Sequence, residues 1–400
     1  MDSYGYVCGS WNFGCDHWLE YNVIMNAKTF SIDKIFLIIV GILMGSGLLF
    51  FLSASLSLLG SHTGELSRIL MSQILLGLVG GIIGAYIMLN IPLKYVKQYA
   101  LPVAIASLLL TALVLVPGIG VRSGGAARWL DLGFISFQPV EILKYTIVIY
   151  YAAWLAYADN KEKTIWYTLV PLLVILGLVG GILLAQPDTD NFMIIAITCI
   201  IMYFVSGAQW KHILLLLLAG LMVGGALIMT RPYILSRLTT FLDPTHDPLG
   251  SSYQVQQALI AVGSGNITGR GFGQSIQKFK YLPEPLSDSI YAVMAEEFGF
   301  VGALGLVVLY LLFGLRGYVI AIKTHDIFHS LIVVGIISLI LFQSLLNIAS
   351  TIALFPLSGL PLVFVSHGGT ALFFACVAIG LVLNISQYQK TVTLPVRRNS

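Results

Sequence analysis

The chain has 400 residues, of which 58% are hydrophobic and 10% are charged, and its formal net charge is +3. Soluble domains carry roughly 25% charged residues, so this composition leaves too few polar side chains to cover a surface in water. It excludes a cytosolic enzyme, a nucleic-acid-binding protein and a disordered chain, and the small net charge does not indicate a polyanionic partner. The sequence therefore predicts an all-α membrane protein that crosses the bilayer several times.

The N-terminal residues 1–33 are polar and aromatic, and they lack the apolar core and small-residue cleavage site of a signal peptide. We expect a cytoplasmic tail here. Cys8, Cys15 and His17 lie in this tail, but they are too few and too widely spaced to indicate a metal site.

A helix needs about 20 apolar residues to cross the bilayer. The sequence contains ten such runs: 36–55, 69–90, 100–117, 139–158, 166–185, 190–206, 212–230, 297–318, 328–350 and 369–387. Lys and Arg are more frequent in the segments that are cytoplasmic if the N-terminus is inside. We therefore expect one ten-helix membrane domain over 34–387 and a C-terminal tail at 388–400, with both termini in the cytoplasm.

Two segments between these runs are expected to be external loops, at 118–138 and, between spans seven and eight, at 231–289. Long loops in a compact membrane protein are usually functional. Both loops contain several glycines and cations. Seven of the cations are candidates for binding a phosphate group through charge-assisted hydrogen bonds: Arg122, Arg128, Arg231, Arg237, Arg270, Lys278 and Lys280.

Ionisable residues at membrane depth are costly, so each is a functional candidate. Lys144 lies early in the fourth run, and Glu141 lies one turn before it on the same helix face. The alternative interpretation is an ion pair between these two residues that serves only the structure.

Asp288 lies where the sequence predicts the start of a helix. Pro283 and Pro285 disfavour helix before it, and Ser287 is the expected N-cap. The Asp288 carboxylate would then lie at the positive end of the helix, with Glu284 nearby in the loop. An acid and a cationic surface at the membrane interface suit an enzyme that acts on a lipid-linked polyphosphate, and they suit a transporter of such a lipid equally well.

Three segments resemble signature motifs of the SEDS family (FtsW, RodA, SpoVE): GAARWLDLGFISFQPVEILK, the block from DPLGSS to EEFGFVG, and FPLSGLPLVFVSHGGTALF. The resemblance covers residues from about 34 to 387, and the FtsW-like branch looks nearer than RodA. Four motifs depart from the usual family pattern. The differing residues are Val140 in FQPVE, Thr189-Asp190-Asn191 where the family usually continues LGTA, Ser289 in place of an aromatic residue, and His367 in place of Tyr.

The resemblance implies a peptidoglycan glycosyltransferase at the outer face of the bacterial cytoplasmic membrane. Such an enzyme polymerises lipid II, the undecaprenyl-pyrophosphate-linked disaccharide-pentapeptide, in cell division or elongation. It usually works with a class B penicillin-binding protein, alongside other division or elongation proteins. A lipid II flippase and a non-catalytic scaffold of the division machinery remain as alternatives.

The resemblance also implies the roles of the candidate residues. Asp288 matches the essential catalytic acid of the family, and Lys144 matches its proposed partner. One inverting displacement needs a single base, for which Asp288 is the candidate. Arginines would neutralise the pyrophosphate leaving group, alone or with a divalent cation such as Mg²⁺ or Mn²⁺. The residues assigned to substrate binding are Arg122, Arg128, Glu141, Arg270, Lys278 and Glu284.

Overall fold

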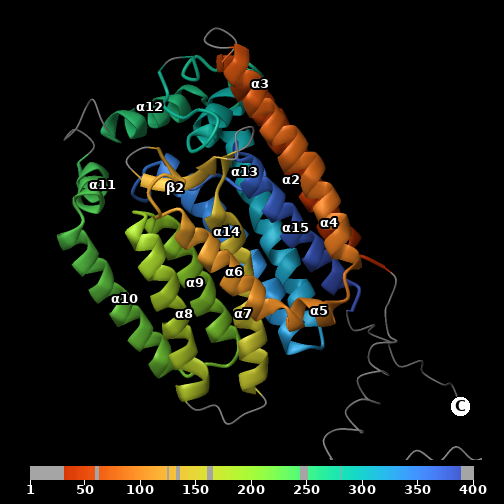
Figure 1. The fold of residues 1–400 in the computed structure, drawn as a ribbon. Coiled ribbons are helices and arrows are strands. Elements are labelled where there is room, and N and C mark those ends of the chain that lie inside the picture. The colour runs from red at the N-terminus through yellow and green to blue at the C-terminus, as the bar shows by residue number, and fades with distance from the viewer. Residues whose placement is uncertain are drawn as a thin grey trace, which may run out of the picture.

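The computed structural model describes residues 31–58, 63–123, 126–131, 136–159, 165–243, 251–279 and 281–388. Most of the expected N-terminal tail and nearly all of the C-terminal tail lie outside these residues. The described residues form a helical bundle whose helices run mostly along one common direction (Figure 1). The two ends of the described chain lie side by side, because Asp33 N donates a hydrogen bond to Ser386 Oγ at 3.1 Å.

The N-terminal part of the bundle consists of α2 (Lys34–Ser55), η1 (Leu56–Leu58), α3 (Thr63–Met71), η2 (Ser72–Gly80), α4 (Gly81–Asn90), α5 (Leu93–Gln98) and α6 (Ala100–Leu113). Helix α2 begins at Lys34 because the Asp33 side chain accepts a hydrogen bond from Phe36 N at 2.9 Å. Helix α4 packs closely on the C-terminal helix α15 (Gly369–Ser386). Gly81 permits this approach, because a Cβ on it would lie 2.9 Å from Cys376 Cβ.

The first expected loop contains a small antiparallel sheet. Its strands are β1 (Gly120–Ser123), β2 (Ala126–Asp131) and β3 (Ser136–Phe137), in the order β1-β2-β3. Val121 pairs with Trp129, and the register shifts between Val121 and Arg122. The sequence indicated only a loop here. The sheet lies over one end of the bundle (Figure 1).

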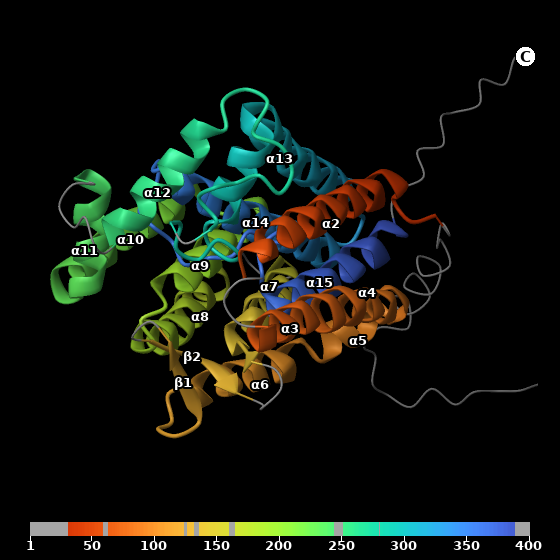
Figure 2. The ribbon, with the colours of Figure 1, turned by 90° about the horizontal axis from the view of Figure 1, so that it is seen from above.

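The middle of the chain forms α7 (Pro139–Asp159), α8 (Ile165–Ala185), α9 (Thr189–Val205), α10 (Trp210–Thr230), α11 (Pro232–Leu242) and α12 (Ser251–Ser264). Helices α7 and α9 pack against the buried α14 (Ile327–Thr351). Helix α10 stands at the edge of the bundle, away from α14 (Figure 2). Only 6% of its most apolar window is buried, so its side chains can face lipid.

Helix α13 (Ile290–Lys323) is broken near its start. Gly299 has φ 67° and ψ −167°, a backbone conformation open essentially only to glycine. The break lets the segment after α12 run beside the helix backbone, where Arg270 N and Gly271 N donate to the carbonyls of Glu296 and Glu297 at 3.0 and 2.9 Å. The loop before α13 is thereby tied to the helix that it precedes.

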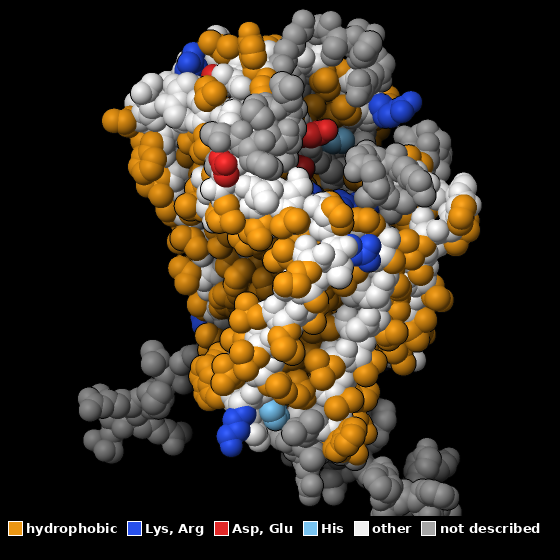
Figure 3. All heavy atoms as spheres, turned by 90° about the vertical axis from the view of Figure 1, so that its left-hand side faces the viewer, with side chains coloured by type: hydrophobic (Ala, Val, Ile, Leu, Met, Phe, Trp, Pro, Cys, Tyr) orange, Lys and Arg blue, Asp and Glu red, His pale blue; other side chains and the backbone are white. Residues whose placement is uncertain are grey.

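The fold is an all-α polytopic membrane protein. Each of the ten predicted runs lies wholly or mostly in helical residues of the described chain, and seven helices are long and apolar enough to cross a membrane. Helices α6 and α9 are apolar but shorter, and α7 is not among the seven, so the exact count of ten spans stays a prediction. Figure 3 shows hydrophobic side chains over most of the middle of one face, as lipid contact requires, with charged groups toward the two ends.

Candidate active site around Asp288

Asp288 lies in a series of turns that lead into α13. The prediction that Ser287 is the N-cap is wrong. The cap residue is Ser289, and α13 begins at Ile290. The reason is that Glu284 adopts a left-handed backbone with φ 47°, and its carbonyl accepts hydrogen bonds from Ser287 N and Ser289 N at 3.3 and 3.1 Å. The turns therefore continue past Asp288, and Ser287 Oγ donates to Glu284 Oε2 at 2.8 Å instead of capping the helix.

The backbone around Asp288 is clamped from two sides. Asn347 Nδ2, on α14, donates to the carbonyl of Asp288 at 3.0 Å and to that of Leu360 at 2.8 Å. Ser366 Oγ donates to the carbonyl of Ser287 at 2.6 Å. The buried helix α14 and the segment at 352–368 thus fix the position of Asp288, as a reacting group requires.

Three charged side chains converge beside Gly359. The position that a Cβ on Gly359 would occupy lies 3.8 Å from Asp288 Oδ2, 3.8 Å from Asp190 Oδ2 and 4.0 Å from Arg128 Nη1. Arg237 Nη1, on α11, adds a fourth charge by donating to Asp190 Oδ1 and Oδ2 at 3.0 and 2.8 Å. Gly359 is exposed, so this cluster is open to a ligand.

The surroundings raise the pKa of Asp288 from its usual 3.8 to about 7. Desolvation by close neighbours is the largest cause, although part of the side chain still reaches solvent. The carboxylates of Glu284 and Asp190 raise the pKa further, while Arg237 and Arg128 lower it. A carboxylate with a pKa near neutrality is suited to accept a proton at physiological pH.

Arg128 retains hydrogen-bonding capacity for a ligand. It projects from β2, and its Nη2 donates to the carbonyl of Pro187. Its Nε is buried and has no hydrogen-bond partner among the described residues. Because an unpaired buried donor is costly, this atom is a candidate contact for an anionic group.

Lys144 does not pair with Asp288 among the described residues. Its buried Nζ donates to Glu141 Oε1 at 2.9 Å and to Gln343 Oε1 at 2.8 Å. An ion pair between Glu141 and Lys144, which the sequence indicated, is present. Gln343 Nε2 in turn donates to the carbonyl of Pro361 at 3.0 Å. Lys144 therefore reaches Asp288 only indirectly, through α14 and the segment at 352–368.

Arg270 and Lys278 lie in the segment between α12 and α13 and form a separate cluster with Glu296 and Glu297 of α13. Lys278 Nζ is buried and donates to Glu297 Oε1 at 2.7 Å and to Ser53 Oγ at 3.0 Å. Arg270 Nε lies 3.3 Å from Glu296 Oε1. The structure thus gives Lys278 a role in the fold instead of the expected substrate contact, because an ammonium enclosed in this way is not available to a phosphate.

The remaining predicted residues lie on the two loops. Glu284 is exposed and adds its charge to the surroundings of Asp288. The backbone of Arg122 pairs with Ala127 in the sheet, and its side chain lies outside the described ones.

Sequence analysis did not place Asp190, Arg237 or Asn347 beside Asp288, although Arg237 was among the cations expected to bind phosphate. The departure at Thr189-Asp190-Asn191 was a signal for Asp190, since it places an additional acid beside a family motif. Only the fold brings Arg237 of α11 and Asn347 of α14 to Asp288.

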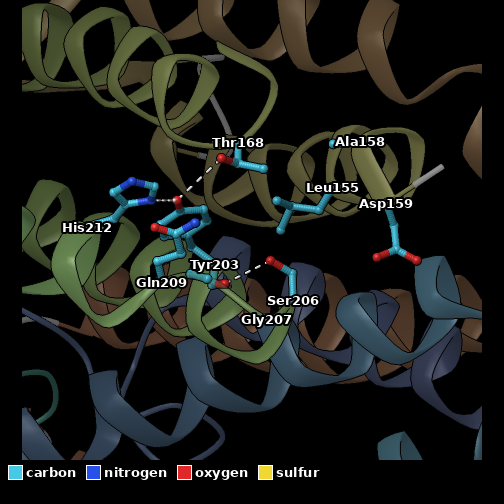
Figure 4. A pocket seen from close by; sticks show the side chains of 10 residues that line it. Leu155, Ala158, Asp159, Thr168, Tyr203, Ser206, Gly207, Gln209 and His212 are labelled. Carbon is cyan, nitrogen blue, oxygen red and sulfur yellow. Dashed lines mark hydrogen bonds between the residues drawn. The ribbon is translucent and has the colours of Figure 1, made fainter. Parts of the chain in front are cut away.

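A cavity of about 130 Å³ lies elsewhere, at the opposite end of α9 from Asp190. Tyr203, Thr168 and His212 line it, with Tyr203 Oη 2.8 Å from His212 Nδ1 (Figure 4). Helix α9 has 17 residues, which separates its ends by about 25 Å. The cavity therefore does not belong to the Asp288 site.

Known proteins resemble this chain along most of its length. It is 35% identical over 366 residues to stage V sporulation protein E of Bacillus subtilis, a match that covers 92% of this chain and 100% of that protein. It is 37% identical over 314 residues to a probable peptidoglycan glycosyltransferase FtsW of Coxiella burnetii, covering 76% of this chain and 83% of that protein.

Solved structures also resemble this chain along most of its length. A chain from a peptidoglycan synthase complex that coordinates polymerization and crosslinking matches with a TM-score of 0.74 and 27% identity, covering 90% of this chain and 98% of that one. The rod shape determining protein RodA of Thermus thermophilus matches with a TM-score of 0.66 and 25% identity, with coverages of 90% and 98%. The sequence model of the FtsW, RodA and SpoVE family, described as cell cycle protein, matches residues 33–391. The chain therefore belongs to the FtsW/RodA/SpoVE family of cell cycle proteins.

Proposed function

We infer that this protein is a peptidoglycan glycosyltransferase, which polymerises lipid II into glycan strands at the outer face of the bacterial cytoplasmic membrane. Relatives named as probable peptidoglycan glycosyltransferases, at 36% and 37% identity, support the activity. The observation that carries the proposal is Asp288, a clamped carboxylate with a pKa of about 7 beside Arg128, at a cluster open to a ligand.

The chemistry follows from the bond that must be made. The donor sugar is α-linked to pyrophosphate and the product bond is β, so one displacement with inversion is sufficient. The ionised Asp288 takes the proton from the acceptor 4-hydroxyl as that oxygen attacks the anomeric carbon. The bond to pyrophosphate breaks and its electrons leave with the phosphate oxygen. General base catalysis of this kind contributes roughly 10²–10⁴-fold to the rate.

Arg128 is the cation best placed to meet the leaving pyrophosphate, because its buried Nε is unpaired within the described chain. Lys144 acts at a distance in this scheme. Its ammonium donates to Gln343, and the Gln343 amide donates to the carbonyl of Pro361. Pro361 follows Leu360, whose carbonyl accepts a hydrogen bond from the same Asn347 amide that donates to the carbonyl of Asp288. The role of Lys144 is to position the base, and its loss would loosen this clamp.

A divalent cation is a further part of the proposal. The described residues contain no cluster of three or more His, Cys, Asp or Glu side chains that could hold a metal. A Mg²⁺ or Mn²⁺ ion would therefore be held mainly by the substrate phosphates, with water completing its coordination. Activity should then fall on addition of EDTA and return with either metal.

A class B penicillin-binding protein is the proposed partner, with other division or elongation proteins. The complex that coordinates polymerization and crosslinking supports this partner, since its chain has the same fold over 90% of the present one.

The exposed apolar side chains of α10 would admit the lipid part of the substrate.

The test uses the purified full chain with a class B penicillin-binding protein and lipid II. Glycan strands separated on a gel are the expected product, and they should require the present chain. A parallel assay in proteoliposomes follows the movement of fluorescent lipid II across the bilayer. Translocation without any strand formation would contradict the proposal and support the flippase.

A further inference from the structure

Asp190 joins three parts of the fold at the site. It lies in the first turn of α9. Its Oδ1 and Oδ2 accept hydrogen bonds from Arg237 Nη1 of α11, and its Oδ2 also accepts one from Gly359 N at 3.0 Å. One carboxylate therefore links α9, α11 and the segment at 352–368 directly beside Asp288.

We propose that Asp190 is a positioning residue for the base. It binds the Arg237 guanidinium on its own carboxylate and thereby keeps this cation from forming an ion pair with Asp288. The inference rests on the proposed function, in which Asp288 must stay basic enough to take a proton. A base locked in an ion pair with Arg237 would be ionised but weakly basic.

The charges that face Asp288 come from four elements: Glu284 from its own turns, Asp190 from α9, Arg237 from α11 and Arg128 from β2. Two other described neighbours are uncharged: Asn347 of α14 and Gln254 of α12 are amides that contact Asp288 and Ser289. His367, whose backbone N donates to the carbonyl of Leu286 at 2.7 Å, has its pKa lowered by burial, which disfavours a charge on this residue.

Asp190 and Arg237 act on Asp288 with opposite signs. Asp190 raises the pKa of Asp288, and Arg237 lowers it. Removing the Asp190 charge takes away one repulsion and also frees Arg237 to approach Asp288, so both effects lower the pKa. Removing the Arg237 charge instead leaves Asp190 unneutralised and raises the pKa. This opposition distinguishes positioning from a general loss of structure.

The first experiment measures the pH dependence of lipid II polymerisation by the full chain with its penicillin-binding protein. In wild type, kcat/KM should rise with an inflection near pH 7. In Asp190→Asn the inflection should move down by roughly one pH unit, and in Arg237→Gln it should move up. Lys211→Gln, which removes an exposed cation at the start of α10, at the opposite end of the bundle, is the control and should leave the inflection in place.

The second experiment does not depend on catalysis. The raised pKa of Asp288 means that the folded protein keeps a proton that the unfolded chain has lost. Wild type should therefore lose thermal stability relative to Asp288→Asn as pH rises from about 4, and the loss should level off above about 7. In the Asp190→Asn background the upper end of this window should move to lower pH, and in the Arg237→Gln background to higher pH.

The outcomes separate the two proposals. If wild type makes no polymer at any pH, the proposed function fails, while the stability window still decides the role of Asp190. Shifts of the same sign in Asp190→Asn and Arg237→Gln would overturn the inference, as would a uniform loss of activity with unmoved inflections. If Asp190→Asn does not fold, an unmoved inflection in Arg237→Gln alone overturns it.

Discussion

At the scale of single residues, the site depends on a small, open space between charges. Asp288, Asp190 and Arg128 all approach the point where a side chain on Gly359 would begin. Sequence analysis identified Asp288 and Arg128 because they lie in recognisable motifs. It could not decide whether Glu141, one turn away, or the more distant Asp288 is the partner of Lys144. Only the packing of α14 determines which group the ammonium reaches.

The space beside Gly359 gives a size-dependent prediction. A Cβ there makes only ordinary contacts of 3.8–4.0 Å, so Gly359→Ala should remain active. Gly359→Leu would fill the space between Asp288 and Arg128, and we expect activity to fall by about 100-fold or more. Gly359 is exposed, so the melting temperature of both variants should stay near that of wild type. Equal activity of the two variants would show that the substrate does not use this space.

The pKa of Asp288 predicts the direction of the pH dependence. A general base must be ionised, and burial together with Glu284 and Asp190 raises its pKa to about 7. The rate of polymerisation should therefore increase as pH rises through 7 and level off above it. A rate that is highest at pH 5 and falls as Asp288 ionises would contradict the assignment and indicate an acid at this position.

At the scale of elements, the broken helix α13 links the loop before it to the rest of the bundle. The break at Gly299 allows the segment containing Gly269 to lie so close that a Cβ on Gly299 would be 2.3 Å from Gly269 N. Lys278 and Glu297 close the same region with a fully buried ion pair. The sequence shows that this loop is rich in glycine, but nothing in it specifies that a helix is broken to receive the loop.

The buried pair gives a prediction about stability. Lys278→Met leaves the Glu297 carboxylate enclosed without its cation, which should cost about 3–5 kcal/mol in the free energy of unfolding. Adding Glu297→Gln should recover part of this loss, because the remaining group is then neutral. Lys323→Met, at the exposed end of α13, is the control and should change stability by less than about 0.5 kcal/mol. Thermal unfolding in detergent measures all three, and a Lys278→Met protein as stable as the control would contradict the role assigned to the pair.

At the scale of the whole molecule, hydropathy was sufficient to predict the helices. Each of the ten apolar runs became a helix because backbone groups in a bilayer must bond within their own segment. The small sheet and the amphipathic helix α11 were not predicted, since both lie in loops whose patterns are short. The ion pair between Asp190 and Arg237 was not predicted for the same reason. It forms only because segments far apart in sequence fold together at one end of the bundle (Figure 1).

The orientation of the bundle is testable by cysteine labelling. In a variant without the native cysteines, Ile276→Cys places a thiol near the Asp288 end, and Trp210→Cys places one at the opposite end of α10; the two native side chains are 52% and 74% exposed. If the Asp288 end is external, an impermeant thiol reagent should label position 276 in spheroplasts and position 210 only after lysis. The reverse pattern would invert the topology and remove Asp288 from the outer face.

The central claim is that Asp288 is the base that allows this protein to polymerise lipid II. The most direct measurement compares Asp288→Asn with Glu284→Gln and wild type, each purified as the full chain with a class B penicillin-binding protein and assayed for glycan strands. Asp288→Asn keeps the shape of the side chain but cannot accept a proton, so it should fold, bind lipid II and lose about 10²–10⁴-fold in rate. Glu284→Gln should lose far less activity than Asp288→Asn, because Asp288 remains to take the proton. Polymerisation by a well-folded Asp288→Asn protein at a rate near that of wild type would contradict the account.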